Sequence, residues 1–169
     1  MIFTFRIFNW RFNFTFAPVT NVTGVNSTLS NGYHVTMWDF DNIKLDCVKV
    51  ALRTVQIQFK LSNIYILNTG TPDHYIAYCF QSASWERSVS IVASTAMVDR
   101  NFLKYGVYRE RWTLRVSPKE GRKPKLIAIL ESPVPETATI ADLKSWVQYE
   151  TLSDNAPMGK KVITIAKRQ

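Results

Sequence analysis

Apolar and polar residues alternate along much of the first 80 residues, a pattern typical of β-strands with one buried face. The clearest case is the stretch "YHVTMWD", which predicts a strand from Tyr33 to about Asp39. The first 16 residues predict one or two strands, and residues 17–32 a polar, turn-forming linker. Two hairpins are predicted further on, the first from residues 63–70 and 73–80, the second from residues 111–118 and 124–132.

Helical spacing of apolar residues predicts three helices. Residues 42–61 form the first, capped by Asp41 or Asn42, although residues 55–59 also alternate like a strand. Its apolar stripe is expected to be Ile43, Cys47, Ala51, Val55 and Phe59. The second helix is expected over 84–104, with a break near Asp99. The third covers 139–152 with Thr139 as its cap, and residues 160–167 follow as a last short strand.

This order of elements predicts an α+β fold with an RRM-like, mostly antiparallel sheet in a single compact domain. The helices are expected to pack on one face of the sheet, and the other face to stay open. The strand and linker of residues 1–32 would precede a core at 33–132, and residues 133–169 would complete or flank that core.

Composition agrees with a globular chain. Apolar residues make up 46% of the 169 residues, and no apolar run approaches the length of a membrane-spanning helix, so no membrane partner is expected. Cys47 and Cys79 are isolated from each other in apolar contexts, which fits a reducing compartment. We therefore expect a cytoplasmic protein, in the host cytoplasm if a virus or plasmid encodes it.

Positive charge is concentrated in one segment. The net charge is +8, and residues 100–125 hold nine Lys and Arg against two Glu. Aromatic residues such as Tyr105, Tyr108 and Trp112 are interleaved with these cations, as suits a nucleic acid whose phosphates are neutralised and whose bases stack. A solvated basic face is the alternative interpretation.

The strand at Tyr33 ends in Asp39-Phe-Asp41, which places two carboxylates side by side on one face. Two such anions repel each other unless a cation or hydrogen-bond donors lie between them. The pattern indicates either a divalent metal site or a strand end that enters solvent.

Four motifs in order resemble the archaeo-eukaryotic primase (primase-polymerase) superfamily, in its small plasmid and virus type. They are "MWDFD" at Asp39 and Asp41, "NTGTPDHYIAY" at His74, "MVD" at Asp99, and "TLRVSPKEG" at Arg115, Ser117 and Lys119. The family pattern is an apolar strand ending in Asp-x-Asp or Asp-x-Glu, a histidine on a glycine-containing hairpin, a third Asp, and a strand bearing Arg, Ser and Lys. Pro72 departs from it, since the family usually has a small hydroxyl-bearing residue there.

The resemblance implies template-dependent nucleotidyl transfer with two divalent ions, Mg²⁺ or Mn²⁺, on a single-stranded DNA template. It makes residues 33–132 a primase-polymerase catalytic core, with Asp39, Asp41 and Asp99 as catalytic metal ligands. The incoming nucleoside triphosphate would be bound by His74, Arg115, Ser117 and Lys119. The template backbone would be bound by Arg109, Arg111, Arg122 and Lys123. A helicase or accessory replication protein is a further partner of this kind of enzyme.

Each residue has a simpler interpretation. Asp41 and Asp99 could cap helices, His74 could be a packed or surface histidine, and Arg115 and Lys119 could line a solvated edge strand. Two rival functions follow. One is a noncatalytic nucleic-acid-binding module on an RRM-like sheet, which would need exposed aromatics on its central strands. The other is a catalytic subdomain that works only with a partner chain.

Overall fold

The computed structural model describes residues 2–8, 10–15, 19–118, 121–143 and 146–152. The chain divides into two compact units, Gly24–Val147 and a smaller one formed by Met1–Thr23 with Gln148–Gln169. The predicted core at 33–132 falls within the larger unit. In the described part of the chain, no helix combines the length and apolar character needed to cross a lipid bilayer.

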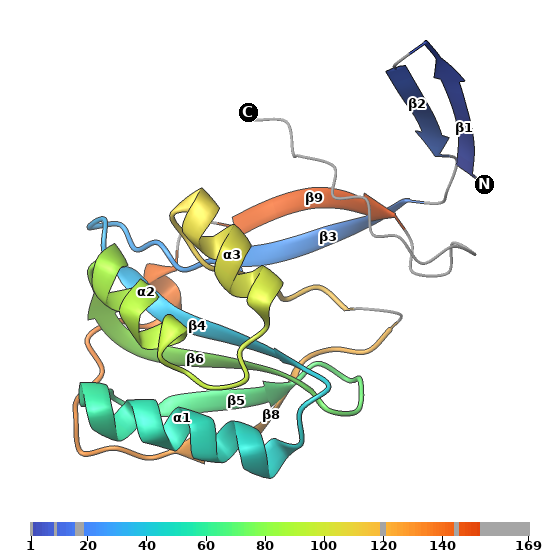
Figure 1. The fold of residues 1–169 in the computed structure, drawn as a ribbon. Coiled ribbons are helices and arrows are strands. Elements are labelled where there is room, and N and C mark those ends of the chain that lie inside the picture. Colours follow the sequence, from blue (N-terminus) through green and yellow to red (C-terminus); the bar gives the residue numbers. More distant parts are fainter. Residues whose placement is uncertain (1, 9, 16–18, 119–120, 144–145, 153–169) are drawn as a thin grey trace. The chain divides into compact units, whose positions relative to one another are not determined.

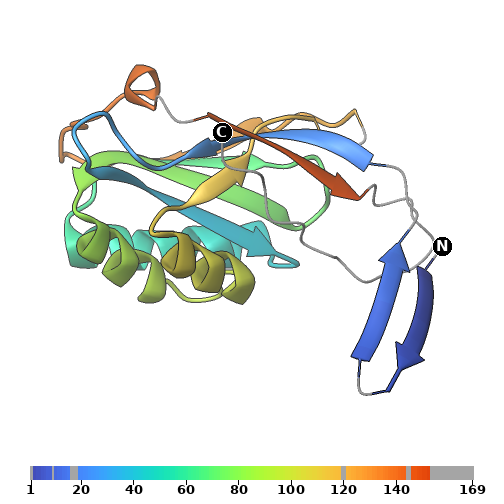
Figure 2. The same cartoon turned by 90° about the horizontal axis from the view of Figure 1, so that it is seen from above.

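The larger unit is built on a four-stranded sheet with the order β4-β6-β5-β8, in which all neighbouring strands are antiparallel. Its strands are β4 (His34–Asp41), β5 (Ile64–Asn68), β6 (His74–Ala83) and β8 (Lys125–Leu130). The helices α1 (Leu45–Phe59), α2 (Trp85–Ala93) and α3 (Arg100–Arg109) lie on one side of it (Figures 1 and 2). The predicted α+β class, with an antiparallel sheet and helices on one face, is confirmed, as is the β5–β6 hairpin.

Helix α1 confirms the predicted helix and, of its predicted stripe, the buried Ala51 and Val55, but not its cap. The N-cap position is Lys44, without a side-chain cap bond, because the chain continues as strand to Asp41. The buried face also includes Val48 and Leu52, whereas Cys47 is exposed. Lys60 ends the helix in a left-handed conformation.

The predicted helix over 84–104 is two helices. Ser84 caps α2 by accepting a hydrogen bond from the Arg87 N–H, and α3 begins after Asp99, close to the predicted break, and continues to Arg109. Trp112 is fully buried and stacks on Phe102 of α3 at 5.2 Å between ring centroids. Its indole N–H donates to Ser88 Oγ of α2 at 2.8 Å, so one side chain joins both helices.

The second face of the sheet is covered over the middle of β4 and β6, where the expectation was an open face. Met37, Ile76 and Tyr78 on this face are all buried. The stretch after β8 lies against β6, since the N–H groups of residues 137 and 138 both donate to the Phe80 carbonyl. Val25, Leu114, Ala138 and Leu143, which come from other parts of the chain, belong to the same buried cluster as these sheet residues.

A second sheet, with the order β7-β3-β9, replaces three predicted features. Strand β3 (Val19–Asn26) lies in the predicted linker, and β9 (Trp146–Leu152) lies in the predicted helix. At the start of that predicted helix, Thr139 forms a capping box with the 3-10 turn Ile140–Asp142. Strand β7 (Thr113–Arg115) pairs with β3, not with β8. The β-branched residues of β3 outweighed its Asn and Gly content, and the β-branched and aromatic residues of β9 outweighed its helical spacing.

In the smaller unit, β1 (Ile2–Ile7) and β2 (Trp10–Thr15) form an antiparallel hairpin. This confirms the strand prediction for the first 16 residues. The strand predicted for 160–167 lies outside the described residues.

Gly106 of α3 offers a test of the Trp112 packing. A Cβ at position 106 would overlap the indole ring of Trp112. Overpacking costs about 1–3 kcal/mol, more than the ~1 kcal/mol that alanine gains over glycine in a helix. We expect Gly106→Ala to lower the free energy of unfolding by about 1–2 kcal/mol in urea titrations. Val107→Ala, at the exposed next position, is the control, and an equal effect of both variants would contradict the packing described.

Candidate nucleotide and metal site

The two aspartates of β4 share one face of the sheet with His74. In the β4–β6 register Asp39 lies opposite Ile76 and Asp41 lies opposite His74. Directly opposite residues of an antiparallel pair project to the same side, so the two carboxylates and the imidazole gather at one end of the sheet. The alternate residues, Trp38 and Phe40, are fully buried on the helix side.

Asp41 and His74 lie within hydrogen-bond distance of each other at this end of the sheet. Asp41 Oδ1 lies 2.7 Å from His74 Nδ1, and both side chains are partly exposed. The contact holds the imidazole beside the carboxylate, at the first residue of β6. The two motifs, which are 33 residues apart in the chain, therefore meet through their side chains.

Asp99 reaches the same strand through its backbone. Its N–H donates to the Asp39 carbonyl oxygen at 2.9 Å, while its side-chain Oδ1 accepts a 2.6 Å hydrogen bond from the Phe102 N–H. The simpler interpretation of Asp99 as a helix cap is thus confirmed. The same residue also lies beside Asp39, so the structure brings the third aspartate to the strand end of the first two.

Left-handed backbone conformations flank the predicted site residues. Asn42 follows Asp41 with φ 60°, Asp73 precedes His74 with φ 57°, and Met97 lies two residues before Asp99 with φ 63°. Asn and Asp tolerate this conformation, whereas a long side chain such as Met is rare there. Such strain is usually stored where function or packing requires it. Here it shapes the three turns that carry the acids and the histidine.

Tyr78 adds an electrostatic partner that the sequence prediction did not include. Burial raises the pKa of its phenol well above the usual value, and the negative charge of Asp39 raises it further. Tyr78 lies opposite Met37, two residues along β4 from Asp39 and on the same face. The neutral phenol is therefore favoured next to the Asp39 carboxylate.

The predicted triphosphate contacts after β7 form a local cluster. The Arg115 guanidinium donates to both the carbonyl and the hydroxyl of Ser117, at 3.2 and 3.3 Å, and to the Pro118 carbonyl at 2.6 Å. These bonds bend the chain back on itself just after the strand. Lys119 lies outside the described residues.

Arg122 connects this basic loop to the His74 hairpin. Its guanidinium donates to the Gly70 carbonyl at 3.3 Å, and its side chain packs so closely on Gly70 that a Cβ there would collide with it. Gly70 has φ 89°, and its N–H is held by the Asn68 side chain at 2.7 Å. This Asx turn, readable from Asn68-x-Gly70, was missed as a determinant of the site.

The other predicted cations are exposed. Arg109 lies over the ring of Tyr105 at 5.8 Å, and Lys104 lies near the same ring at 6.0 Å. Arg111 and Lys123 are also exposed, as is Tyr108, at 84%. The last turn of α3 thus presents cations together with an accessible aromatic ring.

The acids suit a hard divalent ion in their chemistry, because Mg²⁺ and Mn²⁺ take carboxylate oxygens. As the side chains lie, no three His, Cys, Asp or Glu among the described residues are grouped closely enough to hold a metal ion. Two of the carboxylates have other partners, His74 and the Phe102 N–H. The backbone brings the three acids to one place, but their side chains do not form a closed ligand set.

Comparisons with protein-family models, with curated proteins and with solved structures found no match to this chain. Inference about function therefore depends on the residues and their arrangement.

The raised pKa of Tyr78 predicts a loss of stability in alkali. An unfolded tyrosine ionises near pH 10, whereas the folded phenol stays neutral to higher pH. The contribution of the Tyr78 phenol to the free energy of unfolding is therefore fully present below about pH 10, and it falls above that by about 1.4 kcal/mol per pH unit. In urea titrations, we expect the free energy of unfolding of Tyr78→Phe to fall less than that of wild type between pH 9 and 11. Tyr33→Phe, an exposed control, should follow wild type, and equal alkaline loss in all three proteins would contradict the assignment.

Proposed function

We propose that this chain is a nucleotidyltransferase of primase-polymerase type, which joins nucleoside triphosphates on a single-stranded DNA template. The observation that carries the proposal is the meeting of three sequence motifs at one end of β4. Asp41 contacts His74 through its side chain, and Asp99 contacts Asp39 through its backbone. Acids at a strand end with a histidine and a basic loop nearby suit phosphoryl chemistry, which needs positioning and charge neutralisation.

In this proposal Asp39, Asp41 and Asp99 hold Mg²⁺ or Mn²⁺. Such ions acidify the attacking hydroxyl and neutralise charge on the transferred phosphate and the leaving pyrophosphate. The three aspartates supply oxygen ligands from two elements, so they also fix the position of β4 against the start of α3.

His74, Arg115, Ser117 and Lys119 bind the triphosphate. Because Asp41 holds Nδ1 of His74, the ring would present Nε2 to a phosphate oxygen. Arg115 offers a planar guanidinium, which now donates to Ser117 and Pro118. Binding of phosphate would exchange some of these internal bonds for bonds to the ligand.

The template backbone is bound by Arg109 and Arg111 at the end of α3 and by Arg122 and Lys123 before β8. Exposed Tyr108 supplies a flat surface on which a base can stack. A helicase or accessory replication protein remains a proposed partner.

The noncatalytic RRM-like module is less well supported. Such a module stacks bases on aromatic residues exposed on the central strands of its sheet. Here Tyr78 and Phe80 of the central strand β6 are only 7% and 8% exposed. The sheet surface is thus occupied by the protein's own core.

Nucleotide incorporation tests the proposal. The protein is incubated with primed and unprimed single-stranded DNA, labelled nucleoside triphosphates, and Mg²⁺ or Mn²⁺. Asp39→Asn and Asp99→Asn should each reduce incorporation by about 100-fold or more, since each removes a charge from the proposed site. Asn caps helices as well as Asp does, so Asp99→Asn keeps the start of α3 intact.

Asp46→Asn is the matched control, because Asp46 is an exposed acid in the first turn of α1. It should retain wild-type incorporation, and thermal melting should show that all three variants fold. Wild-type DNA binding without any incorporation would overturn the enzyme in favour of a binding module. Nucleotide incorporation that appears only on adding a replication helicase would indicate a catalytic subdomain that works only with a partner chain.

A further inference from the structure

Strand β8 forms an exposed apolar edge of the four-stranded sheet. It is last in the strand order, and among the described residues its only strand partner is β5. Three of its side chains are large, apolar and exposed: Leu126 at 48%, Ile127 at 39% and Ile129 at 45%. An edge strand of this kind is a ready template for another strand.

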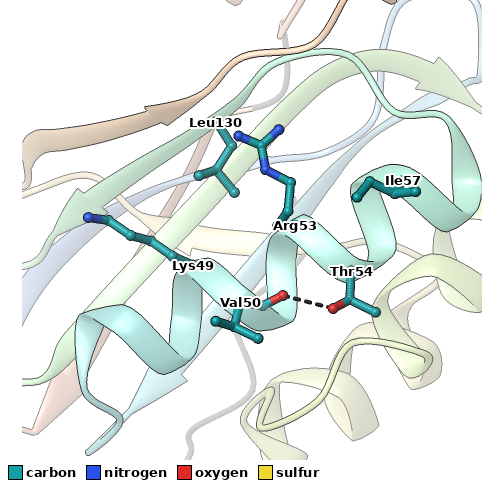
Figure 3. Close-up of a pocket in the computed structure, with 6 residues that line it drawn as sticks. All are labelled: Lys49, Val50, Arg53, Thr54, Ile57 and Leu130. Atoms are coloured by element: carbon teal, nitrogen blue, oxygen red, sulfur yellow. Dashed lines mark hydrogen bonds between the residues drawn. The ribbon is translucent and has the colours of Figure 1, made fainter.

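Apolar surface continues on both sides of this edge. Leu126 and Ile129 lie opposite Leu67 and Tyr65 of β5, so they project to the face away from the helices. On the helix side a shallow groove of about 320 Å³ runs between β8 and α1 (Figure 3). It is lined by Lys49, Val50, Arg53, Thr54, Ile57 and Leu130. No residue of the proposed catalytic site lines it, so it marks a separate surface.

The usual protection of an edge strand is confined here to its ends, where Pro124, Lys125 and Glu131 lie, and to one bulge. Natural edges carry inward charges, proline or bulges that discourage pairing. Between Leu126 and Leu130 no residue is charged and none is proline. The one irregularity is a register shift in the pairing with β5, where Ile127 is an extra residue between Leu126 and Ala128. It bends the strand but leaves an apolar edge.

The sequence of the edge is complementary to itself. Residues 125–131 read Lys-Leu-Ile-Ala-Ile-Leu-Glu, which is symmetric about Ala128 except that its ends carry opposite charges. Lys123 adds to the positive end, and Lys123, Lys125 and Glu131 are all exposed. Antiparallel pairing of two copies sets the positive end of each strand beside the negative end of the other. Parallel pairing would set like charges together.

We propose that β8 pairs antiparallel with β8 of a second copy of this chain, with a two-fold axis at Ala128. The two sheets then become one continuous sheet across the dimer. Because of the extra residue, Ile129 of each copy packs against Leu126 and Ile127 of the other. This inference does not rest on the proposed function, since no residue of β8 belongs to that site.

Sedimentation velocity tests the dimer. Wild-type protein at concentrations up to about 100 μM should show a species of twice the 19.5 kDa chain mass. Ile129→Lys places a charge in the apolar centre of the interface and should leave only the monomer. Ile140→Lys is the control, because Ile140 is 69% exposed but lies outside β8. It should dimerise as wild type does.

Cross-linking tests the register. In a Cys47→Ser background, which removes the exposed native thiol, Ala128→Cys should form an interchain disulfide under mild oxidation. Opposite Cα atoms at the axis are about 4.5–5.5 Å apart, within disulfide reach. Glu131→Cys should not cross-link, since six residue steps of ~3.3 Å separate the two copies of position 131 by about 20 Å. Circular dichroism checks that each variant folds.

A monomer at every concentration would overturn the proposal. A dimer that persists in Ile129→Lys would also overturn it, because the interface would then lie elsewhere. Equal cross-linking of Ala128→Cys and Glu131→Cys would contradict the two-fold axis at Ala128. A wild-type monomer that binds a different protein's strand in a pull-down would replace the second copy with that partner.

Discussion

The pairing of β4 with β6 is the interaction on which the rest of the structure depends. Its register turns Trp38 into the core, where the indole N–H donates to Thr95 Oγ1 after α2, and turns Asp39 to the opposite face. The same register sets Asp41 against His74. A slip by one residue would exchange the two faces, burying both carboxylates beneath the helices and exposing the tryptophan. The apolar side chains of β4 therefore fix the position of its acids.

Elements with strong local patterns could be predicted from the sequence. The β5–β6 hairpin follows from alternation across a turn containing Gly70, and α1 from its helical spacing. The β7–β3 pairing could not be predicted, because it joins residues about 90 apart and depends on non-local burial. The prediction of a helix after Thr139 was wrong because the local pattern is ambiguous. Its apolar spacing suits a helix, whereas its Trp, Val and Tyr also suit the strand that forms in β9.

The candidate site was predictable in its residues but not in its contacts. Asp39, Asp41 and His74 follow from strand alternation together with the hairpin. Nothing local indicates that Asp41 pairs with His74, or that Arg122 packs on Gly70, because such contacts depend on side-chain conformation and loop closure. The left-handed conformation of Met97 was equally hidden, since methionine does not favour it. The sequence thus indicates each acid separately, whereas only the structure shows that Asp41 contacts His74 and that Asp99 caps α3.

The hydrogen bond from the Asp99 N–H to the Asp39 carbonyl has a consequence for how this protein can evolve. Because both groups belong to the main chain, nineteen of the twenty amino acids could occupy position 99 and still supply the donor. Proline alone has no N–H to give. Selection can therefore vary the chemistry carried at position 99 while the attachment of α3 to β4 is inherited unchanged. The backbone attachment and the side chain at this position are in that sense separately adjustable.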